Sequence, residues 1–134
     1  MSIAFPLVEK TVGLGHLWVP YVSLELKGDR TWIPLKFLFD TGADCTMLPR
    51  YLADELGVDL ASCPTFRMTG IEGGSVPAYK ADLDARIGKE RFKLTCLVSE
   101  RDDMPLLLGR QDFFSAFSIE LDNLARVQRL EPLS

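Results

Sequence analysis

The chain has 134 residues, a formal net charge of −4 at pH 7, 47% hydrophobic residues and 25% charged residues. This length and composition fit one globular domain with its own core and exclude a disordered chain. The acidic balance without a basic stripe argues against nucleic-acid binding, and the short apolar runs exclude a membrane span and a signal peptide, so we expect a cytoplasmic protein.

The first part of the chain is expected to form an arm followed by a hairpin. Residues 1–18 contain proline and glycine and show no sustained period, so we expect an N-terminal arm or an irregular first strand. Residues 21–27 alternate between apolar and polar side chains, which predicts a strand with one buried face. A short polar turn separates this strand from the apolar stretch at residues 32–40, so the two are expected to pair.

The middle of the chain predicts one short helix and a long hairpin. In residues 48–57 leucine recurs every four positions, Pro49 suits a first helical turn and Gly57 suits a C-terminal cap. Residues 79–98 contain two alternating runs on either side of the turn "GKE", which predicts an antiparallel hairpin.

The last part of the chain predicts a buried strand, a second short helix and a terminal hairpin. The stretch "MPLLLG" at residues 104–109 is typical of a buried strand, and residues 118–134 alternate around the turn "DN". The second helix is expected to carry Phe113, Phe114 and Phe117. With no repeat or linker, residues 1–134 are interpreted as one mostly β domain.

The cysteines and the histidine do not predict a metal or nucleophile site. Cys45, Cys63 and Cys96 are odd in number and widely spaced, so we expect free thiols without a disulfide framework or a CxxC site. His16 is the only histidine and lacks a ligand partner at metal-binding spacing, which disfavours zinc and a Ser/His or Cys/His system. Accordingly we expect no metal and no cofactor.

One acid stands in an apolar setting, at Asp40 in "FLFDTGADCT", residues 37–46. An ionised carboxylate there costs several kcal/mol unless it is paired, hydrogen-bonded or protonated. Thr41 supplies a hydroxyl, and Gly42 permits a tight turn whose N–H groups can approach the carboxylate. The alternative is an ordinary turn, because Asp, Thr and Gly are common turn residues. A second signature, "LLLGR" at residues 106–110, supports a functional interpretation.

These segments resemble the retropepsin-like aspartic proteases, the single-domain relatives of the retroviral enzymes. Residues 37–46 are similar to the family's catalytic strand and loop, and "TGIEGGS" at 69–75 is similar to its glycine-rich flap. "PLLLGRQDFF" at 105–114 is similar to its hydrophobic-hydrophobic-glycine motif before the closing helix. The resemblance implies a closed or partly closed β-barrel of the acid protease type, with one or two short helices, in a two-fold homodimer. The N-terminal arm at 1–18 and the additional C-terminal hairpin at 118–134 depart from the short terminal strands of the retroviral enzymes.

The resemblance also implies an aspartic endopeptidase acting on peptides or unfolded protein segments. Asp40 of each subunit would share one proton and activate a water, Thr41 hydroxyls would brace the two loops, and Gly42 would leave room for the peptide backbone. The implied substrate-binding residues are Ala43, Asp44, Gly70, Ile71, Glu72 and Gly73. The implied supporting residues are Gly109 and Arg110, with Arg110 paired to Asp44.

Two functions other than an active protease also have to be considered for this sequence. One is a retropepsin-fold dimerisation or peptide-binding module with weak or absent catalysis, although the intact "DTGA" counts against it, because a binding module needs no acid there. The other is a generic β-barrel binding domain in which all three motif matches are accidental, although their joint spacing counts against it. Taken alone, residues 69–75 fit a plain glycine-rich hairpin as well as a flap.

Overall fold

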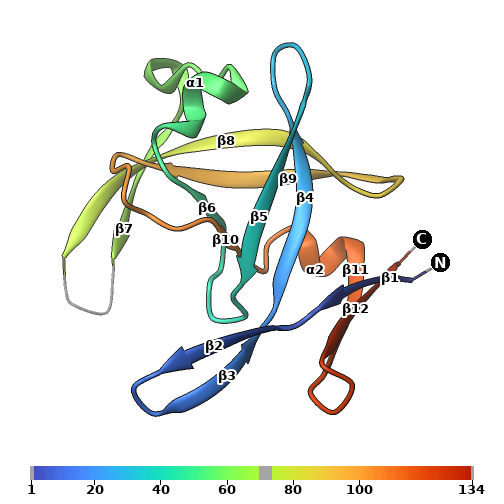
Figure 1. The fold of residues 1–134 in the computed structure, drawn as a ribbon. Helices are drawn as coiled ribbons and strands as arrows, with labels where there is room; N and C mark the ends of the chain where they lie inside the picture. Colours follow the sequence, from blue (N-terminus) through green and yellow to red (C-terminus); the bar gives the residue numbers. More distant parts are fainter. Residues whose placement is uncertain (1, 70–73, 134) are drawn as a thin grey trace.

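The computed structural model describes residues 2–69 and 74–133, which form a mostly β fold with short helices (Figure 1). The strands are β1 (Ile3–Pro6), β2 (Val8–Val12), β3 (Gly15–Val19), β4 (Tyr21–Lys27), β5 (Trp32–Phe39), β6 (Thr46–Leu48), β7 (Thr65–Thr69), β8 (Ser75–Ile87), β9 (Glu90–Ser99), β10 (Leu107–Leu108), β11 (Phe117–Asp122) and β12 (Val127–Pro132). The helices are α1 (Leu52–Leu56), α2 (Phe113–Ala116) and the 3-10 turn η1 (Leu60–Ser62). In the described part of the chain, no helix has the length and apolar character needed to cross a membrane.

Six strands close into a barrel. They are hydrogen-bonded in the order β4, β5, β10, β6, β9 and β8, and β8 pairs back with β4. β7 extends the sheet beyond β8 and lies outside the ring. The barrel form predicted from the resemblance is therefore confirmed for a single chain.

The barrel core consists of the apolar positions that alternate along its strands. The predicted hairpin at residues 79–98 is confirmed, since β8 and β9 pair antiparallel from Ala78 opposite Ser99 to Ile87 opposite Glu90. One face of each strand is buried because neighbouring residues of a strand point to opposite sides of the sheet. The fully buried side chains include Val22, Leu26, Phe37, Leu48, Leu94, Val98 and Leu108.

Both predicted helices are present, and the second is shorter than expected. Gly57 caps α1 in the left-handed conformation, with φ of 68°, as predicted from its place after the leucine repeat. The expectation that Phe117 lies on the second helix is wrong. Phe117 has extended backbone angles, φ −138° and ψ 143°, and it begins β11 opposite Pro132. Its ring is still buried, against the ring of Phe113 at a centroid distance of 5.4 Å.

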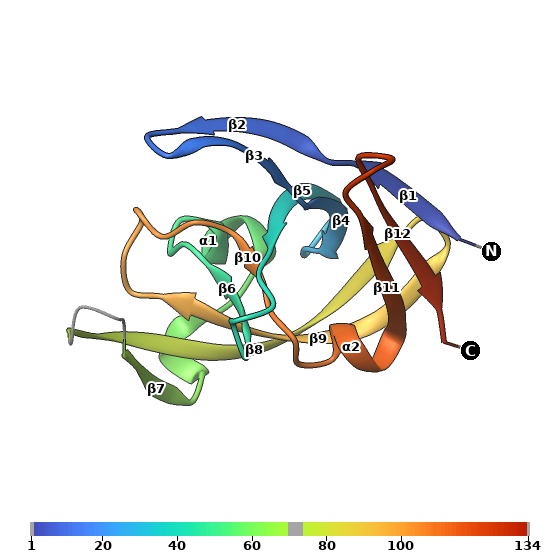
Figure 2. The same ribbon diagram turned by 90° about the horizontal axis from the view of Figure 1, so that it is seen from below.

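The two ends of the chain form a sheet of their own. β12 lies in the middle of this sheet, with β1 on one side and β11 on the other (Figures 1 and 2). Between β1 and β4 the chain makes a second hairpin, in which β2 pairs regularly with β3 from Val8 opposite Val19 to Val12 opposite Gly15. Residues 3–6, 8–12 and 15–19 are therefore regular strands, and the expectation of an irregular first strand is wrong.

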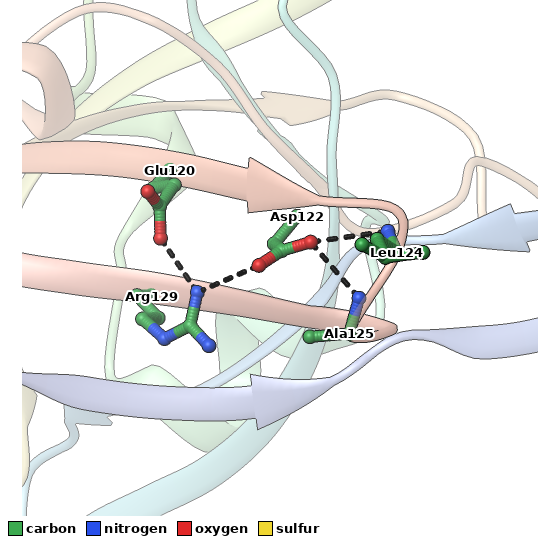
Figure 3. A network of polar contacts seen from close by, with 5 residues as sticks. All are labelled: Glu120, Asp122, Leu124, Ala125 and Arg129. Atoms are coloured by element: carbon green, nitrogen blue, oxygen red, sulfur yellow. Dashed lines mark hydrogen bonds and ion pairs between the residues drawn. The ribbon is translucent and has the colours of Figure 1, made fainter.

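The turn between β11 and β12 is fixed by one carboxylate (Figure 3). Asp122 Oδ1 accepts hydrogen bonds from the N–H groups of Leu124 and Ala125 at 3.0 and 2.9 Å. Arg129 donates from Nη1 to Asp122 Oδ2 at 3.2 Å and to Glu120 Oε1 at 2.6 Å. The Ala125 N–H and the Arg129 guanidinium hold the pKa of Asp122 below its ordinary value. The sequence "LDNLA" thus forms a tight, specific turn.

Gln128 provides a test of the terminal sheet. Its side chain is fully buried, and within the described residues neither its amide nitrogen nor its amide oxygen has a hydrogen-bond partner. A buried polar group without a partner loses its hydration without compensation. We expect Gln128→Leu to raise the free energy of unfolding by roughly 1–3 kcal/mol, measured by urea denaturation. A lower stability of this variant would mean that the amide is satisfied in solution.

The barrel closes at an ion pair, which predicts a pH dependence. Glu25 on β4 lies directly opposite Arg86 on β8 and accepts two hydrogen bonds from its guanidinium, at 2.9 and 3.1 Å. The hydrogen bond from Arg86 lowers the pKa of Glu25 below its ordinary value of 4.5. The pair therefore stabilises the fold fully above that ordinary value, and this contribution is lost as the pH falls through the lowered pKa.

The matched measurement compares the parent chain with Glu25→Gln. We expect the urea midpoint of the variant to be below that of the parent at about pH 7, and the gap to close towards about pH 3. Other carboxylates titrate in both chains, so the difference between them isolates Glu25. A gap that stays constant over this range would contradict a contribution from the Glu25 charge.

Candidate active site

Asp40 lies at the end of β5, and backbone hydrogen bonds hold this end of the strand on both sides. It follows Phe39, the last residue of β5, and its N–H donates to the carbonyl oxygen of Leu108 on β10 at 3.0 Å. On the other side, the N–H of Phe39 donates to the carbonyl oxygen of Pro20 at 2.9 Å. These bonds place the acid at a defined point on the barrel, where the parallel strands β5 and β10 end together.

The loop after Asp40 folds back onto its carboxylate. The N–H of Gly42 donates to Asp40 Oδ1 at 2.9 Å, and the N–H of Ala43 donates to the Asp40 carbonyl oxygen at 3.1 Å. A Cβ on residue 42 would stand 3.3 Å from Asp40 Oδ1, so glycine permits this close turn. The Asp40 side chain is half-buried, whereas Thr41 is exposed. The turn thus presents a carboxylate with one backbone donor and an open side.

The segment after β10 holds this loop in place through hydrogen bonds from its backbone N–H groups. Gly109 is buried, and its N–H donates to the hydroxyl oxygen of the buried Thr46 at 3.1 Å. The N–H of Arg110 donates to the carbonyl oxygen of Ala43, and the N–H of Gln111 donates to that of Asp44, both at 2.9 Å. The predicted supporting position of Gly109 and Arg110 therefore rests on backbone contacts in this structure. Thr46 was not predicted, because its role depends on a partner 63 residues away.

The predicted ion pair between Asp44 and Arg110 does not form. Both side chains are exposed, and no ion pair joins them among the described residues of the single chain. Arg110 instead holds its guanidinium carbon 5.8 Å from the centroid of the Phe114 ring. The backbone hydrogen bonds already tie the loop to the start of α2, so this connection does not depend on the two charges.

Aromatic rings pack together beside the strand end that carries Asp40. The Phe39 ring contacts those of Phe113 and Phe114 on α2 in edge-on geometry, with centroids 5.3 and 5.9 Å apart. Asp112, before the helix, has an unusual φ of 68°, and its Oδ2 accepts the N–H of Thr95 at 2.7 Å. A non-glycine residue with positive φ is strained, and this hydrogen bond holds it in place. The packing fixes the direction in which β5 delivers Asp40.

The open side of Asp40 faces a cleft of about 690 Å³. Three of the chain's four methionines contribute to it, Met47 from β6, Met68 from β7 and Met104 from the segment before β10. Methionine side chains are flexible and polarizable and adapt to apolar partners of different shape. The remaining lining residues are Gly42, Ala43, Thr69, Gly74, Ser75, Val76, Arg101 and Leu107. The cleft combines one acid with an adaptable apolar wall, and it has the size of a site for a short peptide segment.

Not all of the other predicted site residues line the cleft. Thr41 and Asp44 are exposed and are not among the residues that line the cleft. Gly70, Ile71, Glu72 and Gly73, predicted to form the flap tip, lie outside the described residues. The strands that lead to them do reach the cleft, since Thr69 pairs with Ser75 and both line it.

The cysteine next to the site is a protonated thiol. Cys45 is half-buried, and its Sγ–H donates to Gln111 Oε1 at 3.3 Å. Burial raises the pKa of Cys45, and the nearby charges of Asp44 and Asp112 add to the effect. The thiol therefore lacks the thiolate character of a nucleophile. Within the described residues, no three His, Cys, Asp or Glu side chains are grouped so that they could hold a metal ion.

A closed six-stranded barrel with an acid loop between β5 and β6, supported by a parallel β10, defines the acid protease class of the retropepsin type. Residues 22–111 match the family model described as aspartyl protease, and the chain belongs to this family. The resemblance inferred from Asp40, Thr41 and Gly42 and the two flanking motifs is thereby confirmed.

Two solved structures show the same fold. A retropepsin-like aspartic protease from Rickettsia conorii superimposes with a TM-score of 0.67, at 20% identity over 97% of this chain and 90% of that chain. EIAV protease complexed with an inhibitor gives a TM-score of 0.51, at 23% identity over 69% of this chain and 82% of that chain. At these identities the likeness establishes the fold alone. A comparison with the sequences of curated proteins finds no match.

Proposed function

We propose that this protein is an aspartic endopeptidase that acts as a homodimer on extended peptides or unfolded protein segments. The observation that carries the proposal is the Asp40 carboxylate, which faces a cleft of about 690 Å³ and is held by the Gly42 N–H. Membership of the aspartyl protease family supports the same reaction class.

The need for a second copy follows from the chemistry. Hydrolysis by a pair of aspartates requires two carboxylates on either side of one water, whereas this chain has a single "DTG" segment at residues 40–42. A two-fold axis beside Asp40 supplies the second acid from an identical chain. The exposed position of Thr41, away from the cleft of its own chain, is compatible with a contact across that axis.

The proposed mechanism uses one shared proton. Two carboxylates a few ångströms apart do not both ionise readily, so the Asp40 pair holds one proton between them. The ionised Asp40 takes a proton from the water as the water oxygen bonds to the scissile carbonyl carbon, and the protonated Asp40 gives its proton to the carbonyl oxygen. Collapse of the tetrahedral intermediate breaks the C–N bond: the Asp40 that took the proton from water gives it to the leaving nitrogen, and the other Asp40 takes a proton from a hydroxyl of the intermediate, which restores the shared proton.

The lining of the cleft indicates the class of side chain on either side of the cut. Met47, Met68 and Met104 form an apolar and adaptable wall, so we expect apolar residues of varied shape to be accepted. The backbone of the Gly42 to Asp44 loop and the edges of the β7–β8 hairpin offer strand-like hydrogen bonds to an extended peptide.

The experiment that tests the proposal is cleavage of a diverse peptide mixture between about pH 3 and about pH 8, analysed by mass spectrometry. The proposal predicts cleavage next to apolar residues by the parent chain. Absence of cleavage at every pH by a folded dimer would overturn the protease proposal and favour a peptide-binding module of the same fold.

A further inference from the structure

One part of the molecule has no role in the barrel or in the cleft: the hairpin of β2 and β3, residues 8–19. Its two strands form a separate sheet, and Figures 1 and 2 show it projecting from the barrel with its outer part uncovered. Leu14 at its tip is fully exposed, and Val8 and Leu17 are 37% and 51% exposed.

One face of the hairpin is mostly apolar and the other is mostly polar. Residues that pair across strands share a face, and so do alternate residues along a strand. Val8 pairs with Val19, and Leu17 pairs with Lys10 two residues along from Val8, so all four lie on one side. Glu9, Thr11, His16 and Trp18 lie on the other, where Glu9 Oε1 lies 2.9 Å from His16 Nδ1.

The polar face is turned towards the hairpin's own chain. Trp18 stacks under the Arg126 guanidinium of the β11–β12 turn, with 4.4 Å between the guanidinium carbon and the ring centroid. The Leu7 N–H, just before β2, donates to the Arg126 carbonyl oxygen at 2.9 Å. These contacts direct the opposite face, with Val8 and Leu17, away from this turn. Apolar side chains are thus exposed where burial against a partner would be favourable.

The hairpin begins next to the catalytic acid. Val19, the last residue of β3, is followed by Pro20, whose carbonyl oxygen accepts the N–H of Phe39, the neighbour of Asp40. From this point β3 reaches about 17 Å outwards, because a strand rises about 3.3 Å per residue. Figure 1 shows the hairpin and the loop after β5 at the same end of the barrel.

A second copy of the chain must approach at this end. On the proposed function, on which this inference rests, the two Asp40 carboxylates come within about 3 Å of each other, so the two-fold axis passes beside the root of the hairpin. A stable interface covers about 800 Å² on each subunit, and the short loop at residues 40–44 is too small to supply this area. The contact therefore has to extend onto elements that project beside the loop.

The terminal strand β12 is not free to supply it. β12 already pairs along one edge with β1 and along the other with β11, both within the same chain. Its edges are therefore closed to strand exchange with a partner. The exposed apolar face of the hairpin has no such engagement.

We propose that the β2–β3 hairpin is the dimerisation arm of this protein: its apolar face, with Val8 and Leu17, packs on a second copy of the chain and brings the two Asp40 loops together. The occupant is the same chain, because the catalytic site is incomplete without a second Asp40 and the arm starts beside it.

The test is sedimentation equilibrium of three full-length chains, each with its cleavage activity recorded. The double variant Val8→Ser with Leu17→Ser removes the apolar face, and the control Glu9→Ser with Thr11→Ser changes the opposite face of the same hairpin. We expect the dissociation constant of the dimer to rise at least about tenfold in the first variant and to stay near the parent value in the control.

A shortened chain tests the inference without depending on how the hairpin variants fold. In it an Asn-Gly turn replaces residues 9–18 and joins Val8 to Val19, which already lie opposite each other. We expect this shortened chain to be a folded monomer by circular dichroism and sedimentation. A dimer of unchanged dissociation constant in the shortened chain would overturn the inference, and so would a monomeric parent.

The outcomes separate this inference from the protease proposal. If shortening abolishes dimers but the dimeric parent cleaves no peptide, the arm is correct and the proposed activity is wrong. If the parent cleaves peptides and the shortened chain remains an active dimer, the activity is correct and the arm is wrong.

Discussion

Asp40→Asn is expected to abolish peptide hydrolysis and to leave the fold and the dimer intact. Asparagine keeps the size of the side chain and an oxygen that can accept a hydrogen bond from the Gly42 N–H. In the parent chain this bond joins Gly42 N to Asp40 Oδ1 at 2.9 Å. It can neither take a proton from water nor hold the proton that the mechanism requires. Loss of this general acid and base function should lower kcat by about 10³-fold or more.

The measurement is the initial rate on a peptide identified from the cleavage mixture, together with sedimentation of both proteins. The matched control is Asp54→Asn on α1, which makes the same chemical change at an exposed position outside the cleft. The control should retain the parent rate. Full activity of the Asp40 variant would exclude Asp40 as the catalytic acid.

Gly109→Ala is expected to destabilise the protein strongly and to remove activity. A Cβ at this position would lie 2.3 Å from the Cys45 carbonyl carbon and 2.4 Å from its oxygen. Backbone atoms in a packed loop cannot move aside without breaking the hydrogen bonds from Arg110 to Ala43 and from Gly109 to Thr46. Overpacking of this severity costs about 3 kcal/mol or more of the free energy of unfolding.

The measurement is urea denaturation, followed by activity under conditions where the variant is folded. A displacement of the Asp40 loop of about 1 Å would by itself lower the rate by about 10²-fold. Gly74→Ala is the stability control, since a Cβ there meets no described atom within 4 Å. Equal stability of Gly109→Ala and the parent would show that the loop does not pack on residue 109 as described.

The sequence was most informative where burial imposes a period. Val22, Leu24 and Leu26 on β4 alternate because one face of the strand is in the core, so the strand could be recognised locally. The hairpin of β2 and β3 was missed because most of its residues are exposed on both faces. Its polar run at residues 9–11 therefore shows no alternation.

The candidate site, like the fold, could be predicted from the sequence only in part. Asp40, Thr41 and Gly42 are adjacent in sequence, so their turn and its hydrogen bond could be predicted. The methionine wall could not, because Met47, Met68 and Met104 come from separate segments that only the closed barrel brings together. The sequence does not show in which direction a side chain points. For this reason it suggested an ion pair between Asp44 and Arg110 that is absent from the described residues.

In the proposed enzyme, one active site uses Asp40 from each of two identical chains, and mixing of parent and variant subunits shows whether the two carboxylates act together. Parent and Asp40→Asn chains are unfolded together, refolded in equal amounts and assayed at constant total protein. If each site needs two Asp40 carboxylates, random pairing leaves about one quarter of the parent activity, because only parent dimers are active. Retention of about one half would mean that each chain works alone and would contradict the shared site.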